Sequence, residues 1–380
     1  MRQKEAVFVR SNSLDRDVRL PKEMTTINRA GYRTRHIYWD RERRADRPME
    51  LENHRAIPFR LKAPWGTGVL PLLPLWWVFI FVRLMMMRFD IVHVVNFDSV
   101  IPCVIAAKLK RKPVVYELLD VYEELLPTGL RAIGMAVDKI IMRLAAAIIV
   151  VDDEQVQGIG GIPNRRIVTI YDSPPDYLIR DDNGSPDNKK NEKFTLFYAG
   201  QLIRDRLLNL DKVIEAMKDI DGVKLVVAGY GDMAKEIREM AARLPDKLEF
   251  IGKINYQEVI RRGRLADLFF VLRDPVLPFY RYICGSTLFN AMICGKPILV
   301  NLGTSTTKKV TRENCGLAVN SGNVQEIKQA IIKLRDNPQL CRELGANARQ
   351  AYGQRYGWDI MSQRLVELYN QLTQEVNRAG

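Results

Sequence analysis

The chain has 380 residues and a mass of 43.7 kDa, which is enough for two domains that each bury a core. Hydrophobic residues make up 47% and charged residues 27%, a balance that excludes collagen-like, disordered and multi-span membrane proteins. The five cysteines lack Cys-x-x-Cys spacing, and the N-terminus is too polar for a secretory signal. These features predict a cytoplasmic protein without a metal centre. The net charge of +13 predicts an anionic partner, which could be a nucleic acid, a nucleotide or a lipid surface.

In the first half of the chain, short apolar runs alternate with helical patterns. The predicted strands lie at 6–10, 36–39, 91–95, 114–116 and 148–151, and the predicted helices at 19–30 and 101–109. Continuous apolar strands separated by helices are typical of a parallel sheet that is covered on both faces. A polar stretch with three prolines, 173–192, follows and predicts a linker.

The same alternation begins again after the linker. Strands are predicted at 195–199, 224–228, 248–251, 268–272 and 298–300, and helices at 210–217, 233–243, 257–262, 286–294 and 324–334, with two more helical stretches reaching 372. We therefore expect an α/β fold with two doubly wound, Rossmann-like domains. Because ligands bind beyond the carboxyl ends of such strands, two facing sheets predict a binding cleft between the domains.

One predicted helix, 286–294, carries the most chemistry. Gly285 precedes it, Ser286 suits its N-cap, and Gly295 and Pro297 follow its end. Free backbone N–H groups and the helix dipole make such an N-terminus a phosphate site, with the hydroxyl of Thr287 nearby. The pattern alone also fits an ordinary strand–helix unit that binds nothing.

Further segments resemble, in order and spacing, the landmarks of a known family. They are 197–206 (FYAGQLIRDR), 226–231 (VVAGYG), 250–253 (FIGK), 265–268 (LADL) and 290–297 (NAMICGKP), with weaker matches at 15–19 and 90–93. In these segments the chain resembles the family-four (group 1) retaining glycosyltransferases of the GT-B fold.

The resemblance implies two domains and a reaction. An acceptor-side domain is expected at 1–172, with a C-terminal helix, 358–380, crossing back to it, and a donor-binding domain at 193–357. The implied reaction moves a sugar from a nucleoside diphosphate-sugar, expected to be UDP-linked, to a saccharide or lipid-linked acceptor. It would serve polysaccharide or glycolipid synthesis, and it needs no cofactor and no metal.

The resemblance also assigns roles to residues. Arg206 takes the place of the diphosphate-binding lysine, and its guanidinium suits a bidentate phosphate contact. Arg206 and His93 are catalytic candidates, although a lone histidine after an apolar strand also fits a structural role. A third catalytic candidate, Asp120, is chosen because it follows the end of a predicted strand, where a carboxylate could face an acceptor hydroxyl. The expected donor-binding residues are Gly200, Gln201, Arg206, Gly229, Lys253, Ile254, Tyr282, Gly285, Ser286, Thr287 and Asn290.

Three positions depart from the family pattern. Gln201 stands where the family has a second basic residue, so Arg204 or Arg281 would have to supply the charge. Tyr282 and Asn290 replace two glutamates that lie near the donor sugar and the ribose. These changes leave open a degenerate protein that binds a nucleotide-sugar with little transfer.

A dinucleotide-binding enzyme is a further alternative. Gly229, Gly231 and Ala234 follow a predicted strand in the GxGxxA pattern, and Glu249 lies at the distance expected for a ribose-binding acid. Nucleic acid is not the favoured partner, because the basic runs belong to no recognised reading module.

The last feature is an apolar stretch, 63–82, which contains no charge. Prolines and glycines interrupt its first part, which leaves a helix at 75–87 that is too short to span a bilayer. We predict that 75–88 lies on an anionic membrane, at the inner face of the plasma membrane. A buried helix or a subunit interface would fit the same sequence.

Overall fold

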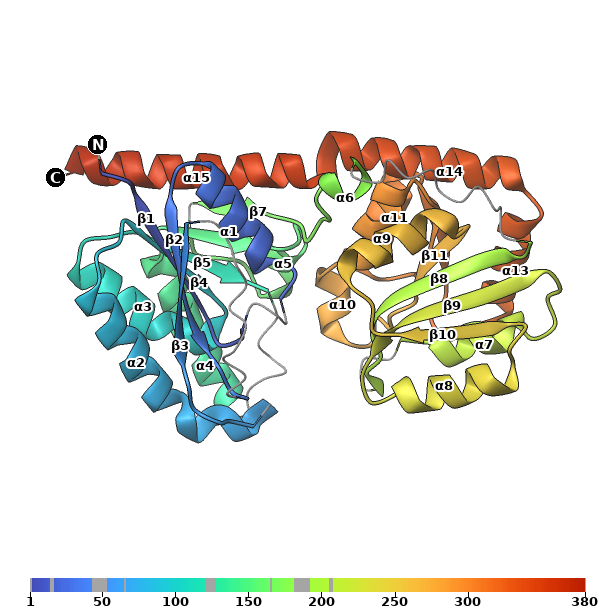
Figure 1. Cartoon of the computed structure of the whole chain (residues 1–380), viewed down its shortest axis with the longest axis horizontal. Coiled ribbons are helices and arrows are strands. Elements are labelled where there is room, and N and C mark those ends of the chain that lie inside the picture. The colour runs from blue at the N-terminus through green and yellow to red at the C-terminus, as the bar shows by residue number, and fades with distance from the viewer. Residues whose placement is uncertain are drawn as a thin grey trace. The chain divides into compact units, whose positions relative to one another are not determined.

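The computed structural model describes residues 2–13, 17–42, 53–64, 66–119, 128–164, 166–180, 192–204 and 208–379. The chain forms two compact units, Met1–Ile170 with Met361–Gly380, and Tyr171–Ile360 (Figure 1). Residues 173–180 of the predicted linker belong to the second unit. Its remainder lies outside the described residues, apart from residue 192.

The first unit is built on a seven-stranded parallel sheet with the order β3-β2-β1-β4-β5-β6-β7. Its central strands are buried along their whole length, as continuous apolar runs require when helices cover both faces. The strands are β1 (Glu5–Arg10), β2 (Arg33–Trp39), β3 (His54–Phe59), β4 (Ile91–Val95), β5 (Val114–Leu118), β6 (Ala147–Val150) and β7 (Ile167–Thr169).

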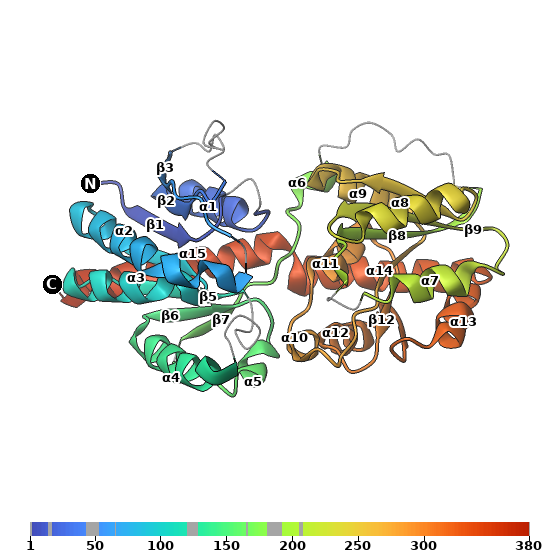
Figure 2. The same cartoon turned by 90° about the horizontal axis from the view of Figure 1, so that it is seen from below.

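Helices cover both faces of this sheet (Figure 2). The helices are α1 (Leu20–Arg29), α2 (Leu73–Met86), α3 (Phe97–Leu109), α4 (Thr128–Leu144), α5 (Gln155–Gly158) and the C-terminal α15 (Trp358–Ala379), with a 3-10 segment at Gly66–Leu72 before α2. Buried side chains of α2, α3 and α4, such as Trp76, Cys103 and Ile141, share one apolar core with the sheet. Tyr369 of α15 stacks on Phe8 of β1, on the other face.

The edge strand β3 was not predicted from the sequence. It contains Arg55 and Pro58, and a proline normally argues against a strand. The position of β3 at the end of the strand order explains the exception, because an edge strand can leave one row of backbone groups unpaired. The helix α4 and the short strand β7 were also missed.

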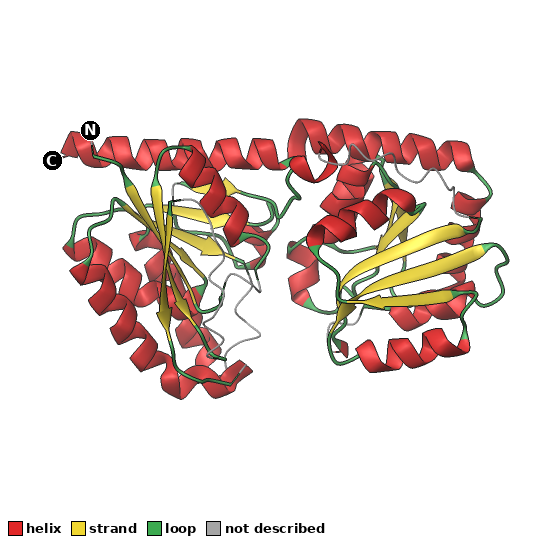
Figure 3. Cartoon of the chain, in the orientation of Figure 1, coloured by secondary structure: helices red, strands yellow, loops and turns green. Residues whose placement is uncertain are grey.

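The second unit has a six-stranded parallel sheet with the order β10-β9-β8-β11-β12-β13, drawn in yellow in Figure 3. Its strands are β8 (Phe194–Gln201), β9 (Val223–Tyr230), β10 (Leu248–Gly252), β11 (Leu268–Val271), β12 (Ile298–Asn301) and β13 (Gly316–Val319). The two parallel sheets confirm the predicted fold class of two doubly wound domains.

The helices of the second unit follow the predicted alternation with three additions, α6, α10 and α12. The helices are α6 (Tyr177–Arg180), α7 (Leu210–Met217), α8 (Ala234–Arg243), α9 (Tyr256–Leu265), α10 (Pro278–Tyr282), α11 (Ser286–Cys294), α12 (Ser305–Glu313), α13 (Val324–Arg335) and α14 (Pro338–Ala351), with a π turn at Tyr352–Tyr356. The bounds of α7 and α11 are those predicted. The missed helix α12 has few apolar residues, and its polar first turn is nevertheless buried.

The last helix, α15, begins in the second unit and belongs to the first unit from Met361 onward. Lys4 donates to the hydroxyl of Thr373 at 2.9 Å, and Arg166 forms a two-pronged pair with Glu375 at 2.6 and 3.2 Å. Polar contacts to the first strand and to the end of the sheet therefore fix this part of α15 on the first unit.

Candidate functional site

In the second sheet the chain adds β9 and β10 on one side of β8. It then returns and adds β11 on the other side, so the strand order reverses between β8 and β11. Ligands of open α/β sheets bind beyond the carboxyl ends of the strands at such a switch point. Gly200 and Gln201 end β8, and Arg273 follows the end of β11. This edge of the second sheet is therefore the candidate site.

The helix α11 starts at the same edge. Gly285 is its N-cap, with φ −80° and ψ 162°, and Ser286 is the first helical residue. The predicted N-cap was therefore wrong by one residue, since no side chain caps this helix. The amides of Ser286 and Thr287 lie in the first turn, where an α-helix offers its N–H groups no acceptor of its own. They carry the partial positive charge that attracts an anion.

Arg273 brings a full positive charge to this helix start. Its Nη2 and Nη1 atoms lie 3.3 and 3.4 Å from the place that a Cβ atom of Gly285 would occupy. The guanidinium also lies over the ring of Tyr280, 5.0 Å from its centroid. The Nε atom is buried and has no hydrogen-bond partner among the described residues. The glycine thus lets a guanidinium reach the open end of a helix, which is an arrangement suited to a phosphate.

Hydrogen bonds to the backbone hold Arg273 in position. Asn209 donates to the carbonyl of Leu272 at 3.0 Å, and Asn301 donates to the carbonyl of Arg273 at 3.0 Å. Both amides also contact the hydroxyl of Ser321, which donates to Asp274 at 2.9 Å. The segment after β11 is therefore tied to β12 and to the start of α7, and Arg273 emerges from a fixed backbone.

Arg273 was missed in the sequence analysis because no family motif includes it. The predicted strand at 268–272 placed it directly at a carboxyl end. Two other arginines were expected to replace the charge missing at Gln201, and both are engaged elsewhere. Arg204 forms an ion pair with Glu236, and Arg281 donates to the carbonyl of Pro275 at 2.5 Å.

The residues predicted beside the donor at β8, β9 and β10 lie along this edge. Gln201 is exposed, and its amide approaches the hydroxyl of Tyr230 at 3.5 Å. The ammonium of Lys253 lies 5.1 Å from the centroid of the same Tyr230 ring, and Ile254 follows half-buried. These side chains form an exposed rim that surrounds Tyr230.

The glycines of the predicted dinucleotide pattern serve packing. A Cβ atom on Gly229 would lie 2.1 Å from the carbonyl oxygen of Gly200, and one on Gly231 would lie 2.2 Å from that of Leu202. The expected ribose-binding acid, Glu249, is paired with Lys224 at 2.6 Å. Close contact between β8 and β9 therefore accounts for this pattern without a dinucleotide.

Asn290 is less available to a ligand than the sequence suggested. It is 4% exposed, and its Oδ1 atom accepts a hydrogen bond of 2.8 Å from the hydroxyl of Tyr256. Its NH₂ group and the second lone pair of Oδ1 remain to contact a ribose hydroxyl. Tyr282, the other substituted position, ends α10 and is half-buried. Two further predicted site residues, Arg206 and Asp120, lie outside the described residues.

His93 does not lie on a surface. It is completely buried in β4, its Nδ1 atom contacts the hydroxyl of Tyr369 at 2.9 Å, and its Nε2 atom lies 3.3 Å from Glu117. These contacts join β4, β5 and α15. We therefore correct the catalytic role predicted for His93 to a structural one, because a side chain sealed on both ring nitrogens cannot reach an acceptor.

The contacts of His93 extend into a buried ionic cluster. Arg19 donates from Nε to Glu117 at 2.7 Å and lies 3.0 Å from Glu23. Glu23, His93 and Glu117 each offer one atom that could ligate a metal ion, and these three atoms lie within 4.8 Å of one another. The guanidinium of Arg19 already supplies the positive charge that a metal ion would bring, so the geometry fits an ion cluster.

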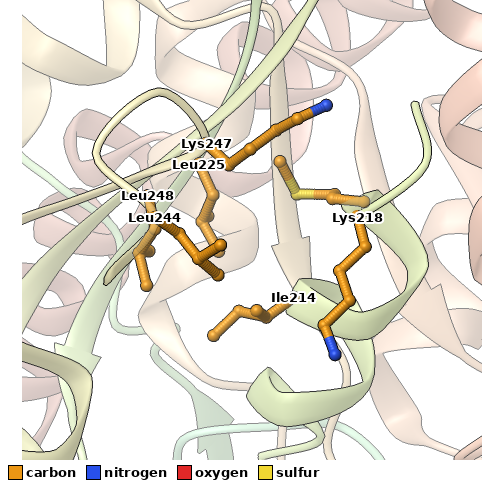
Figure 4. A pocket seen from close by; sticks show the side chains of 7 residues that line it. Ile214, Lys218, Leu225, Leu244, Lys247 and Leu248 are labelled. Carbon is orange, nitrogen blue, oxygen red and sulfur yellow. The ribbon is translucent and has the colours of Figure 1, made fainter. Parts of the chain in front are cut away.

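A cavity of about 200 Å³ opens elsewhere in the second unit (Figure 4). Its lining is mostly aliphatic and consists of Ile214, Met217, Lys218, Leu225, Leu244, Lys247 and Leu248. Leu248 begins β10 and Leu225 lies near the start of β9, so the cavity is at the amino ends of these strands. It is therefore separate from the candidate site at their carboxyl ends.

Comparison with known proteins gives two family matches. A model described as "Glycosyl transferases group 1" matches residues 180–351, and one described as "Glycosyl transferase 4-like domain" matches residues 23–172. A mannosyltransferase of Corynebacterium glutamicum, described as GDP-mannose-dependent and acting on a monoacylated phosphatidylinositol monomannoside, is 26% identical over 165 residues. The capsular polysaccharide glycosyltransferase CapM of Staphylococcus aureus is 21% identical over 192 residues. The matched stretches span 42% and 48% of these relatives' own lengths, and 42% and 49% of this chain.

Solved structures resemble nearly the whole chain. Sucrose-phosphate synthase of Thermosynechococcus elongatus has a TM-score of 0.78 at 16% identity, with 97% of this chain and 99% of that chain covered. HepE of Anabaena, solved in complex with UDP-glucose, has a TM-score of 0.70 at 18% identity, with 97% and 99% covered. With both halves of the chain matched by family models and both sheets in Rossmann order, the chain belongs to the group 1 glycosyltransferases of the GT-B fold.

Proposed function

We propose that this protein transfers a sugar from a nucleoside diphosphate-sugar, with UDP as the nucleotide, to a saccharide or lipid-linked acceptor. The reaction proceeds with retention at the anomeric carbon and serves polysaccharide or glycolipid synthesis. The observation that carries the proposal is Arg273 at the open first turn of α11, beside the switch point of the second sheet. Family membership supports sugar transfer as the reaction.

The chemistry needs positive charge where the leaving group forms. When the bond between the sugar and the diphosphate breaks, negative charge grows on the phosphate oxygens, and fixed donors stabilise it best. The amides of Ser286 and Thr287 and the guanidinium of Arg273 would supply such donors, the arginine through two parallel bonds. No metal ion and no cofactor is required for this step in the proposal, since the nucleotide-sugar is a substrate.

The choice of UDP rests on a neighbour's ligand. The similar HepE structure is described as a complex with UDP-glucose, whereas the corynebacterial relative is described as GDP-mannose-dependent. The exposed ring of Tyr230 beside Lys253 offers a surface on which a base could stack. Thermal-shift measurements with UDP-, GDP- and ADP-sugars therefore form the first test, because a ligand that binds only the folded state stabilises it.

The second test is a substitution at the site. We expect Arg273→Gln to weaken UDP binding by roughly 10- to 100-fold in a calorimetric titration, since a charge-assisted hydrogen bond contributes about 1.5–3 kcal/mol. Arg281→Gln is the matched control and should change the affinity by less than about threefold, because its side chain is engaged with Pro275. If no nucleotide binds, the proposed function fails. If UDP binds Arg273→Gln as tightly as the unmodified protein, the placement of the diphosphate fails.

A binding protein with little transfer is the second candidate. It is favoured by Asn290, which supplies no carboxylate where the family has a ribose-binding glutamate and which is buried and bonded to Tyr256. A single-turnover assay separates the two functions. Release of UDP from bound UDP-sugar, dependent on an acceptor, supports transfer, whereas tight binding without release supports the binding protein.

A further inference from the structure

The first unit presents an apolar stripe to solvent along α2. Trp76, Ile80 and Leu84 on the inner side of this helix are completely buried in the core. The outer side carries Leu75 (55% exposed), Val78 (62%), Val82 (44%), Met85 (38%) and Met86 (77%). A surface helix of a soluble protein normally places polar residues on its outer side. The outer side of α2 therefore lacks a partner that would cover it within the described residues.

The helical stretch Gly68–Met86 is long and apolar enough to cross a membrane, by length and composition. Its inner face is nevertheless part of the core that joins α2 to the sheet, together with Trp39 and Val92. A helix that spans a bilayer lies within the hydrocarbon layer and cannot at the same time pack on the sheet of a water-exposed domain. Because α2 is packed on the sheet, it can lie on the surface of a membrane but does not cross the membrane.

A second helix continues the stripe. Ile105 and Leu109 of α3 are 49% and 63% exposed. The ammonium of Lys110, just after α3, donates to the carbonyl of Met87 at 2.6 Å, which places the C-terminal ends of α2 and α3 side by side (Figure 2). The seven exposed residues of the two helices thus form one patch, which we call the α2–α3 face: Leu75, Val78, Val82, Met85, Met86, Ile105 and Leu109.

Basic residues gather at one end of the α2–α3 face. Arg83, Arg88, Lys108 and Arg111 are exposed there, and the last three form no ion pair with a described residue. The chain has no Asp or Glu between Glu52 and Asp90 and none between Asp98 and Glu117. Asp98 starts the opposite end of α3, where it accepts bonds from two serines. The basic end of the face is therefore not balanced by acids on its own helices.

We propose that the α2–α3 face binds the surface of an anionic phospholipid bilayer, with the aliphatic stripe in the interfacial layer and the cations on lipid phosphates. An apolar helix face with cations beside it is the arrangement by which helices bind in the interfacial layer of an anionic membrane. The cluster of unbalanced cations complements an anionic headgroup layer. The face brings the first unit to the membrane in which a lipid-linked acceptor would lie.

The test uses the full chain in flotation with vesicles of phosphatidylcholine alone or of phosphatidylcholine mixed with phosphatidylglycerol. We expect binding to the anionic vesicles only. The variant Arg88→Gln/Lys108→Gln/Arg111→Gln should bind about 100-fold more weakly, because each cation near an anionic surface strengthens binding about fivefold. The variant Val78→Ser/Val82→Ser/Met86→Ser should lose binding to a similar extent.

Two controls in the second unit match these variants. Lys218→Gln/Lys235→Gln/Lys333→Gln removes three exposed cations, and Val276→Ser removes a side chain that is 61% exposed. Both should bind vesicles like the unmodified protein, and all variants should keep its thermal response to UDP. Absence of binding to anionic vesicles overturns the proposal, as does binding that neither α2–α3 variant weakens. A dimer in gel filtration that the serine variant dissociates would also overturn it, because a second copy would then cover the face.

Discussion

Two buried glutamates in the first unit are expected to respond very differently to replacement by glutamine. Glu117 is completely buried and accepts a hydrogen bond of 2.7 Å from Nε of Arg19, whose Nη2 atom lies 2.5 Å from the same carboxylate oxygen. Arg19 holds the pKa of Glu117 well below its usual range, although burial opposes this. Burial and the charge of Glu117 raise the pKa of Glu23 well above its usual range. The charged form of Glu117 is therefore stabilised by Arg19, whereas burial and the neighbouring Glu117 favour the protonated form of Glu23.

The magnitudes follow from these charge states. Glu117→Gln leaves Arg19 buried without a counter-charge, which costs about 3–5 kcal/mol. In a unit of this size such a loss lowers Tm by roughly 10 °C. Below the unfolded pKa of about 4.5, where Glu23 is protonated in both the folded and unfolded states, Glu23→Gln replaces a neutral acid by a neutral amide of the same shape, so we expect a change within about 1 kcal/mol there. Removing the exposed carboxylate of Glu375, which pairs with Arg166, is the matched control and should cost less than about 1 kcal/mol.

The pH dependence has a different sign for each glutamate. The lowered pKa of Glu117 contributes stability that is present above its unfolded pKa of about 4.5 and is lost as the pH falls toward the folded value. The raised pKa of Glu23 contributes stability at low pH that is lost as the pH rises through the folded value. The free energy of unfolding of Glu23→Gln, relative to that of the unmodified protein, should therefore grow as the pH is raised from 5 over roughly the next few pH units.

Urea unfolding followed by tryptophan fluorescence measures these differences, since four of the five tryptophans belong to the first unit. Equal destabilisation by the two glutamine substitutions would refute the assigned charge states. So would a larger loss for Glu23→Gln than for Glu117→Gln.

Two further predictions concern stability. Gly229→Ala should cost about 2 kcal/mol or more, because its Cβ atom would lie 2.1 Å from the carbonyl oxygen of Gly200. Gly353→Ala is the control and should change stability little, because nothing lies within 4 Å of its Cβ position. Similar urea midpoints for the two variants would contradict this prediction. Burial raises the pKa of Asp138 to about 6, although Tyr116 donates to it at 2.8 Å. The stability from this group is lost as the pH rises through about 6. Between pH 4 and pH 7 the free energy of unfolding of Asp138→Asn should therefore rise by about 3 kcal/mol relative to that of the unmodified protein. A stability difference that stays constant with pH would show that Asp138 keeps an ordinary pKa.

Apolar periodicity determined most of the fold. Strands such as β4 and β8 and the capped helix α11 are local patterns, since their apolar runs and flanking glycines act over a few residues. Two of the misses, β3 and α12, share a physical cause. Whether β3 forms a strand depends on an available sheet edge, and whether the polar helix α12 forms depends on the space beside β12. Neither condition can be read from the local sequence, because both depend on the tertiary surroundings of the segment.

The candidate site divides in the same way. The sequence by itself determined that a helix starts at Gly285, Ser286 and Thr287, and it predicts a phosphate site there because a helix N-terminus has unpaired amides wherever it occurs. Only the tertiary structure decided which cation faces that helix and that His93 is sealed in an ion cluster. Arg273 precedes Gly285 by twelve positions, and the path of the segment that joins β11 to α11 brings the two together. A long side chain reaches its partner only after the sheet has fixed both backbones, so charge placement is a property of the fold.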